Sequence, residues 1–361
     1  MKLLVDCHVF DGKYQGTRTY LEGLYTHLTQ NRDIDFYFAA YDVEKLKTVF
    51  GESDNITYIQ ISNDCSVKRL TFVYPQIIRK YRIDYAHFQY ITPFLKCCKE
   101  IVTIHDLLFI DYPQYFPLLY RFAKKILFKR AALRADILLT VSKYSQEAIW
   151  RHFGIDETDI HITYNGILPN CSHKIDVKKK YGIQKYILSV SRIEPRKNYL
   201  ILLKAFNELS LWDAGYYLVI VGVKDLNYHE FYAYYNSLKE DIKNKIIFLQ
   251  VPFDDLVALY ANASLFVFPS LAEGFGIPPL EALTYGCPLL CSNATAMSEF
   301  EFPDVISFNP LDFEELKRKM KVLLTKSPIN LQEIRRKILF KYDWAKIADD
   351  FYNILEKHRQ V

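Results

Sequence analysis

Apolar runs of strand length alternate with amphipathic segments of helix length along almost the whole chain. We predict strands at 2–10, 35–41, 56–62, 84–90, 100–107, 135–142, 160–167, 186–193, 216–223, 245–252, 264–270 and 288–293. Helices are expected between them, notably at 17–30, 116–134, 199–210, 253–262, 278–285 and 312–324. Such alternation is typical of α/β proteins, whose parallel sheets are covered on both faces. Because twelve strands in one sheet would be unusual, we expect two sheets.

The segment 168–184 is polar, basic and contains a proline, so we predict a linker there. It separates a first domain, 1–168, from a second, 169–344. A helix at 343–357 follows the last strand pattern and could pack on either domain. Open α/β sheets bind ligands beyond the carboxyl ends of their strands. With two such sheets, the cleft between the domains is the expected site.

Composition narrows the class of protein further. A chain of 361 residues, half of them hydrophobic, can form two cores. A net charge of +4 is too mild to imply a nucleic-acid partner. The chain has no apolar run of eighteen residues, and its opening meets Asp6 and His8 at once, which argues against a signal peptide. Seven cysteines without a spaced framework fit a reducing compartment. We therefore expect a cytoplasmic protein whose membrane contact, if any, is peripheral.

The stretch LAEGFGIPPLEALTYG, 271–286, follows a predicted buried strand. Gly274 and Gly276 allow a tight turn, and two prolines then favour a first helical turn. Gly286 suits a left-handed end to that helix. The geometry points backbone N–H groups and the positive end of a helix dipole at the loop, where an anion would fit.

Two carboxylates border this loop. Glu273 precedes the turn, and Glu281 lies in the first turns of the helix. Both could accept hydrogen bonds from the hydroxyls of a ligand that also carries a phosphate. The alternative is an ordinary turn whose two glutamates face water.

Charged residues follow two other strands. Arg192 and Lys197 lie past the strand at 186–193 and could clamp a diphosphate, with Arg196 the more solvent-facing cation; the alternative is a solvated basic loop. His105 ends the strand at 100–107. It could bind a sugar hydroxyl, shuttle a proton, or be a core histidine with satisfied hydrogen bonds.

The segment 10–24 resembles a phosphate-approach loop, with Gly16 and Thr17 at the junction to a helix, but it lacks the dinucleotide and P-loop fingerprints. The segment 121–134 carries six basic residues and no acid. On it, Phe122, Ile126, Leu127 and Leu133 can share one face while Lys124, Lys125, Lys129 and Arg130 surround it. This pattern fits a helix on an anionic membrane, or an ordinary helix covering a sheet. No cluster has zinc spacing and no serine-hydrolase elbow is present.

Together, SRIEPRKN, YNGI, EGFGIPPLEALTYGCPLLCSNATAMSE and the amino-terminal glycine loop resemble the retaining glycosyltransferases of family 4. The likeness runs nearly end to end and extends to bacterial mannosyltransferase-type members. It implies the GT-B fold, with two facing Rossmann-like domains of parallel sheets and an interdomain cleft. It also implies that helix 345–361 packs back on the first domain.

The resemblance assigns roles residue by residue. Arg192 and Lys197 would hold the donor diphosphate, and Glu281 the nucleotide ribose. Glu273 and His105 would contact the transferred sugar. The remaining donor-binding positions are Gly274 with the amides of Phe275, Gly276 and Ile277, and, from the opposite domain, Gly16 and Thr17. Two segments depart from the family's pattern, VKDLNY after 222 and FEFPDVIS after Glu299, so contacts to the base are not carried over.

The implied reaction transfers a hexose with retention of configuration and without a metal or other cofactor, through front-face substitution. GDP-mannose is the favoured donor and a UDP-sugar the next. The acceptor would be a glycan or a polyprenyl-linked glycan, in cell-surface polysaccharide synthesis at the inner face of the membrane. Two alternatives are a non-hydrolysing sugar-nucleotide epimerase, which would turn over donor without an acceptor, and a scaffold that binds the donor without turnover.

Overall fold

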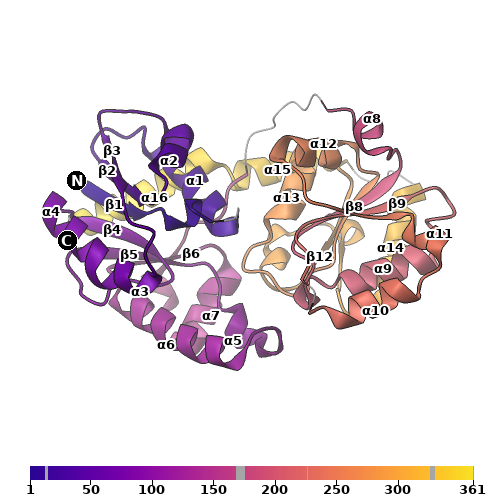
Figure 1. Cartoon of the computed structure of the whole chain (residues 1–361), viewed down its shortest axis with the longest axis horizontal. Helices are drawn as coiled ribbons and strands as arrows, with labels where there is room; N and C mark the ends of the chain where they lie inside the picture. Colours follow the sequence, from indigo (N-terminus) through magenta and orange to yellow (C-terminus); the bar gives the residue numbers. More distant parts are fainter. Residues whose placement is uncertain (13–14, 168–174, 226, 326–329, 361) are drawn as a thin grey trace. The chain divides into compact units, whose positions relative to one another are not determined.

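The computed structural model describes residues 1–12, 15–167, 175–225, 227–325 and 330–360. Its backbone divides into two compact units (Figure 1). Unit 1 comprises Met1–Gly166 and Tyr342–Val361, and unit 2 comprises Ile167–Lys341. The predicted division into an acceptor-side domain, 1–168, and a donor-binding domain, 169–344, stays a prediction. Residues 168–174 of the predicted linker lie outside the described residues, and the rest of it contains a helix, α8 (Val177–Tyr181).

Unit 1 is built on a seven-stranded parallel sheet of order β3-β2-β1-β4-β5-β6-β7. Its strands are β1 (Lys2–Asp6), β2 (Asp35–Ala40), β3 (Ile56–Gln60), β4 (Tyr85–Gln89), β5 (Lys99–Ile104), β6 (Ile137–Thr140) and β7 (Ile160–Ile162). The principal helices are α1 (Gly16–Leu28), α2 (Val43–Phe50), α4 (Tyr74–Tyr81), α6 (Leu118–Arg134), α7 (Lys143–Phe153) and α16 (Trp344–Arg359), with short α3 (Ser66–Lys68) and α5 (Leu108–Asp111).

Alternate residues of these strands pack against different helices, because successive side chains of a strand point to opposite faces. Leu4, Phe88 and Val102 contribute to the clusters that also contain residues of α4, α6 and α7. On the opposite face, His87 lies against Tyr25 of α1 and Phe351 of α16. The last helix of the chain therefore completes the core of the first unit.

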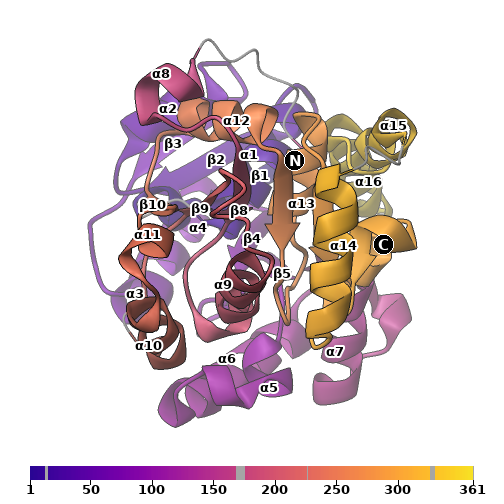
Figure 2. The same ribbon diagram turned by 90° about the vertical axis from the view of Figure 1, so that its right-hand side faces the viewer.

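Unit 2 has a six-stranded parallel sheet of order β10-β9-β8-β11-β12-β13. Its strands are β8 (Tyr186–Val190), β9 (Tyr217–Val221), β10 (Ile246–Leu249), β11 (Leu265–Phe268), β12 (Leu289–Ser292) and β13 (Ser307–Phe308). Besides α8, its helices are α9 (Tyr199–Glu208), α10 (His229–Ser237), α11 (Glu240–Lys243), α12 (Phe253–Asn262), α13 (Ile277–Thr284), α14 (Phe313–Thr325) and α15 (Leu331–Lys341). Helices α9, α10 and α14 lie beside this sheet (Figure 2). Their side chains form one core cluster with it.

The predicted fold class is therefore confirmed: both sheets are parallel and both lie among helices. Each predicted strand run overlaps an observed strand, and β13 is an additional strand of two residues. Several predicted strands were too long. The run 2–10, for example, ends as a strand at Asp6, and His8–Phe10 forms a 3₁₀ turn. Val9 and Phe10 are buried in that turn, so hydrophobicity alone could not distinguish it from a strand.

Trp344, the first residue of α16, packs directly against α1 at Gly23. Its indole is 2% exposed and lies where a Cβ at Gly23 or Gly166 would be. We expect Gly23→Ala to destabilise unit 1 by about 1–2 kcal/mol, because the cost of overpacking outweighs the gain in helix propensity. Urea unfolding followed by fluorescence in a Trp212→Phe background measures this, since the remaining tryptophans, Trp150 and Trp344, both belong to unit 1.

Two further variants test the cause. In a Trp344→Leu background, Gly23→Ala should cost less stability than it does with the indole present, because the clashing ring is absent. Thr26→Ala, at an exposed position of the same helix, serves as the control and should change stability by less than about 1 kcal/mol. If Gly23→Ala stabilises the protein, as helix propensity alone predicts, the indole does not hold this position.

Candidate active site

The site in unit 2 lies where two neighbouring strands end. β8 pairs in parallel with β11, so their carboxyl ends lie at the same edge of the sheet. β8 also pairs with β9, and the strand order therefore changes direction at β8. In open α/β sheets, ligands bind beyond the strand ends at such a switch point. The segments that follow these two strands carry Arg192, Lys197 and Glu273.

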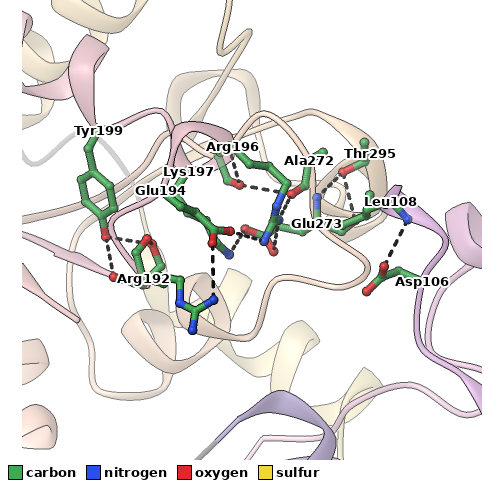
Figure 3. A network of polar contacts seen from close by, with 12 residues as sticks. Asp106, Leu108, Arg192, Glu194, Arg196, Lys197, Tyr199, Ala272, Glu273 and Thr295 are labelled. Atoms are coloured by element: carbon green, nitrogen blue, oxygen red, sulfur yellow. Dashed lines mark hydrogen bonds and ion pairs between the residues drawn. The ribbon is translucent and has the colours of Figure 1, made fainter. Parts of the chain in front are cut away.

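Glu273 is the centre of a charged network (Figure 3). Its side chain is 10% exposed. Lys197 Nζ donates a hydrogen bond to Oε1 at 2.6 Å, and Arg196 donates to Oε2 at 3.2 Å. The backbone is held as well: Glu273 N donates to Thr295 Oγ1 at 2.8 Å, and that hydroxyl donates to Glu273 O at 3.1 Å. Sequence segments far apart thus fix one carboxylate in place.

The two cations keep this carboxylate ionised. Burial by itself raises the pKa of Glu273, but the charges of Lys197 and Arg196 and the hydrogen bond from Lys197 lower it to about 2. Glu273 is therefore an anion throughout the physiological pH range. A carboxylate of such low basicity is a poor proton acceptor, and it suits hydrogen bonding to hydroxyl groups better than general-base chemistry.

The prediction that Arg196 is the more solvent-facing cation was wrong. Arg196 is 14% exposed and donates to Glu194 Oε1 at 2.7 Å in addition to Glu273. Arg192 is the exposed cation, at 63%, and its nearest carboxylate oxygen, on Glu194, is 3.9 Å away. The reason is the 3₁₀ turn Pro195–Lys197, which directs Arg196 and Lys197 at the strand end of β11.

The glycine loop has the predicted form. Gly276 has φ +99°, and a Cβ there would also approach Met297 Cγ to 3.1 Å, so glycine is required. α13 begins at Ile277, and Gly286 follows it with φ +76°. Because Pro278 and Pro279 have no N–H, Gly276 and Ile277 supply the N–H groups of the first turn. Phe275 is buried and packs its ring edge against Phe300.

Glu281 lies on α13 and accepts a hydrogen bond from Tyr260 of α12, at 2.9 Å, on Oε2. Burial raises the pKa of Glu281, and this hydrogen bond opposes the rise. The structure therefore does not support the alternative of two glutamates that face water: Glu273 is buried and Glu281 is partly buried. Among the described residues, Oε1 of Glu281 accepts no hydrogen bond.

The predicted site residues of unit 1 are His105, Gly16 and Thr17. His105 follows β5, is 7% exposed, and contacts the rings of Tyr20 and Tyr90. Its Nε2 lies 2.7 Å from Oε1 of Gln89, at the end of the adjacent strand β4. Gly16 and Thr17 form the first turn of α1; Gly16 is exposed and Thr17 is half-buried.

Gln89 determines which nitrogen of His105 carries the proton. Because the Gln89 oxygen accepts, neutral His105 donates from Nε2, and Nδ1 keeps a lone pair. Burial lowers the pKa of His105 to about 3, so the ring is neutral near pH 7. Of the three roles considered, the proton shuttle is disfavoured, and accepting a hydrogen bond from a hydroxyl remains chemically available.

Several residues of these networks were not identified from the sequence, namely Glu194, Thr295, Tyr260 and Gln89. Thr295 lies within a segment that carried the family resemblance, so it could have been noticed. Tyr260 and Gln89 gave no signal, because each acts through a partner distant in sequence. Among the residues that the structure describes, no group of three or more His, Cys, Asp or Glu side chains is arranged to hold a metal ion.

Family comparisons cover both halves of the chain. Residues 14–170 match the model described as Glycosyltransferase Family 4, and residues 173–338 match Glycosyl transferases group 1. The O-antigen chain mannosyltransferase B of Escherichia coli is 30% identical over 302 residues, which cover 72% of this chain and 76% of that protein. The O-antigen chain mannosyltransferase RfbU of Salmonella typhimurium is 30% identical over 59% of this chain, and the match spans 57% of its own length.

Solved structures agree with the fold. HepE of Anabaena, crystallised in complex with UDP, superimposes with a TM-score of 0.74 at 17% identity. The match covers 99% of each chain. At this identity the similarity establishes the architecture alone, which is that of the GT-B proteins.

Proposed function

Since the chain belongs to the family 4 glycosyltransferases, we propose that it transfers a hexose from a nucleoside-diphosphate sugar to a glycan or lipid-linked glycan acceptor, with retention of configuration. The observation that carries this proposal is the charged network around Glu273, at the switch point of the second sheet. It combines a fixed carboxylate, for sugar hydroxyls, with cations for a diphosphate.

The ion pairs of the network favour Arg192 as the cation that meets the diphosphate first. Glu194 and Glu273 already neutralise Arg196 and Lys197, whereas Arg192 is mostly exposed and only weakly paired. We assign Arg192 and Lys197 to the diphosphate, together with the backbone N–H groups of Phe275, Gly276 and Ile277. Negative charge builds on the leaving nucleoside diphosphate, and these fixed donors can stabilise it without a divalent cation.

Front-face substitution fits the state of Glu273. A carboxylate whose pKa is about 2, held by two cations, is a weak nucleophile, so we assign it to sugar hydroxyls rather than to covalent catalysis. A leaving phosphate oxygen would then accept the proton of the acceptor. A trapped glycosyl-enzyme that mapped to Glu273 would overturn this mechanism.

Unit 1 contributes fewer groups to the proposal. His105 would accept a hydrogen bond from a hydroxyl of the transferred sugar through Nδ1, the nitrogen that Gln89 leaves unprotonated. Gly16 and Thr17 would bind the diphosphate through the first turn of α1. The mannosyltransferase names of the relatives favour GDP-mannose as donor, and UDP-sugars come next, as in the UDP complex of HepE.

Calorimetric titration with GDP, UDP, GDP-mannose, UDP-glucose and UDP-N-acetylglucosamine, without added metal, tests the donor site. We expect one nucleotide to bind selectively, and Glu281→Ala to weaken its binding about tenfold, because a hydrogen bond from ribose to a charged group is lost. Glu240→Ala is the matched control: it removes an exposed carboxylate of the same unit and should leave the affinity unchanged.

Other outcomes of the same titration favour other functions. If Glu281→Ala binds as tightly as the wild type, the ribose does not contact that carboxylate. Selective binding without transfer to any acceptor would indicate a scaffold. Conversion of the donor in the absence of an acceptor would indicate an epimerase.

A further inference from the structure

The outer side of α6 exposes an unusual amount of apolar surface. Five large hydrophobic side chains of this one helix are more than half exposed: Leu118 (72%), Leu119 (85%), Phe122 (69%), Ile126 (54%) and Leu133 (59%). Leu119, Phe122, Ile126 and Leu133 follow one another at intervals of three, four and seven residues, and Leu118 precedes Phe122 by four, so all five lie along one side of the helix. Soluble proteins rarely leave such a contiguous strip uncovered, and a strip of this kind marks an interaction surface.

The inner side of the same helix is firmly packed. Phe128, Ala131 and Ala132 are buried in the core of unit 1, and Phe128 stacks on Tyr90 with ring centroids 4.7 Å apart. Arg130 donates to the carbonyl oxygen of Phe94 at 2.7 Å. The exposed strip is therefore presented by a rigid element.

The structure corrects the predicted composition of this surface. Leu127 packs partly against the core instead of joining the exposed face. Arg130 and Arg134 hydrogen-bond to backbone carbonyls, and Lys124 is half-buried beside two aromatic rings. The basic residues that border the strip are thus Arg121, Lys125 and Lys129, which follow one another at intervals of four.

In the part of the chain that the structure describes, these three cations have no acidic partner. α6 contains no Asp or Glu, and within the described residues none of the three makes an ion pair. A second copy of the chain docking symmetrically on this helix would oppose like charges. An anionic lipid surface offers the complementary charge, and its acyl region can accept the apolar side chains. No helix of the described residues is long and apolar enough to cross a membrane.

We propose that the outer face of α6 docks unit 1 onto an anionic lipid bilayer, with the helix in the plane of the interface. Leu118, Leu119, Phe122 and Ile126 enter the boundary between headgroups and acyl chains. Arg121, Lys125 and Lys129 lie at the lipid phosphates. This docking does not depend on the transfer reaction, and it would bring unit 1 to a surface that can hold a lipid-linked acceptor.

Cosedimentation with vesicles, without any nucleotide sugar, tests the proposal. The wild type should bind vesicles of phosphatidylglycerol and phosphatidylcholine more tightly than vesicles of phosphatidylcholine alone. Changing Arg121, Lys125 and Lys129 to glutamine should weaken binding to the anionic vesicles about tenfold to a hundredfold. Changing Leu119, Phe122 and Ile126 to serine should abolish binding to both kinds.

The matched control changes Lys178, Lys179 and Arg336 to glutamine. These three residues are exposed on helices of unit 2, so the variant loses the same net charge without touching α6. It should bind like the wild type. Circular dichroism and thermal unfolding confirm that each variant is folded.

Three outcomes would overturn the proposal. The wild type does not bind anionic vesicles, the unit 2 control loses as much affinity as the α6 variant, or the serine variant binds normally. Analytical ultracentrifugation without lipid tests whether a second copy of the chain binds to the outer face of α6 instead. A dimer that the serine variant dissociates would assign this face to a second copy of the chain instead.

Discussion

Replacing Lys197 with methionine should destabilise unit 2 by about 2–4 kcal/mol, since Glu273 then keeps a buried negative charge with only Arg196 beside it. The same change should reduce transfer from the donor by about a hundredfold to a thousandfold, if Lys197 stabilises the leaving diphosphate as proposed. Hydrogen exchange of the amides of β8 and β11 measures the stability, and turnover with the identified donor measures the rate.

Two variants separate these effects. In Lys197→Met/Glu273→Gln the unpaired charge is absent, so stability should recover in part while turnover stays low. Lys180→Met is the matched control, because Lys180 also lies 2.6 Å from a carboxylate, that of Asp255, but is 50% exposed. It should cost less than about 1 kcal/mol. If Lys197→Met and Lys180→Met lose equal stability, burial does not make loss of the Lys197–Glu273 ion pair more destabilising than loss of an exposed one.

Acidification from pH 6.5 to 5 should cost unit 1 about 3 kcal/mol of stability, through His87 and His105. Both rings are buried, and burial lowers the pKa of each to about 3. An unfolded chain protonates these imidazoles near their ordinary pKa of 6.5. Between these two values the unfolded state binds more protons than the folded state, so stability falls as pH falls. Half-buried His161, whose pKa burial also lowers, acts in the same direction.

Urea unfolding at several pH values between 5 and 7.5, in the Trp212→Phe background, measures this loss. In this pH range the carboxyl group of Asp6 does not affect the measurement. Its pKa in the folded protein is lowered to about 2, so its protonation changes stability only at lower pH. His87→Gln should remove about half of the pH dependence contributed by the pair, even if it lowers stability at pH 7.5. An unchanged slope in that variant would mean that His87 is protonated in the folded protein.

The architecture was predictable because buried parallel strands are nearly uniform in their hydrophobicity. Apart from Ser189, the strands Tyr186–Val190 and Leu265–Phe268 are apolar on both faces, and polar residues such as Lys185, Ser191 and Ser264 flank them. Strand ends were less predictable, since a buried turn such as His8–Phe10 has the same composition as a strand. β13 was missed because two residues carry no periodicity.

The candidate site was predictable as a set of segments but not as a set of contacts. Arg192 and Arg196 are four residues apart in one loop, and only the 3₁₀ turn decides which of them reaches Glu273. The same limit applies to α6. Phe128 is buried in the core of unit 1, and this places the neighbouring Leu127 partly against that core rather than on the exposed face. In each case the deciding contact joins residues distant in sequence.

The contact of Trp344 with Gly23 and Gly166 also affects the order in which the two units can fold during synthesis. Unit 1 needs α16, yet the ribosome completes the whole of unit 2 before it reaches that helix. At about 5–20 residues per second, the sheet of unit 1 waits roughly ten to thirty seconds without α16 on the face that also carries α1. Unit 2 is continuous and can fold as it emerges. The half of the chain that is synthesised first is therefore the one that completes its folding last. Premature termination within α16 would destabilise the amino-terminal unit and leave unit 2 intact.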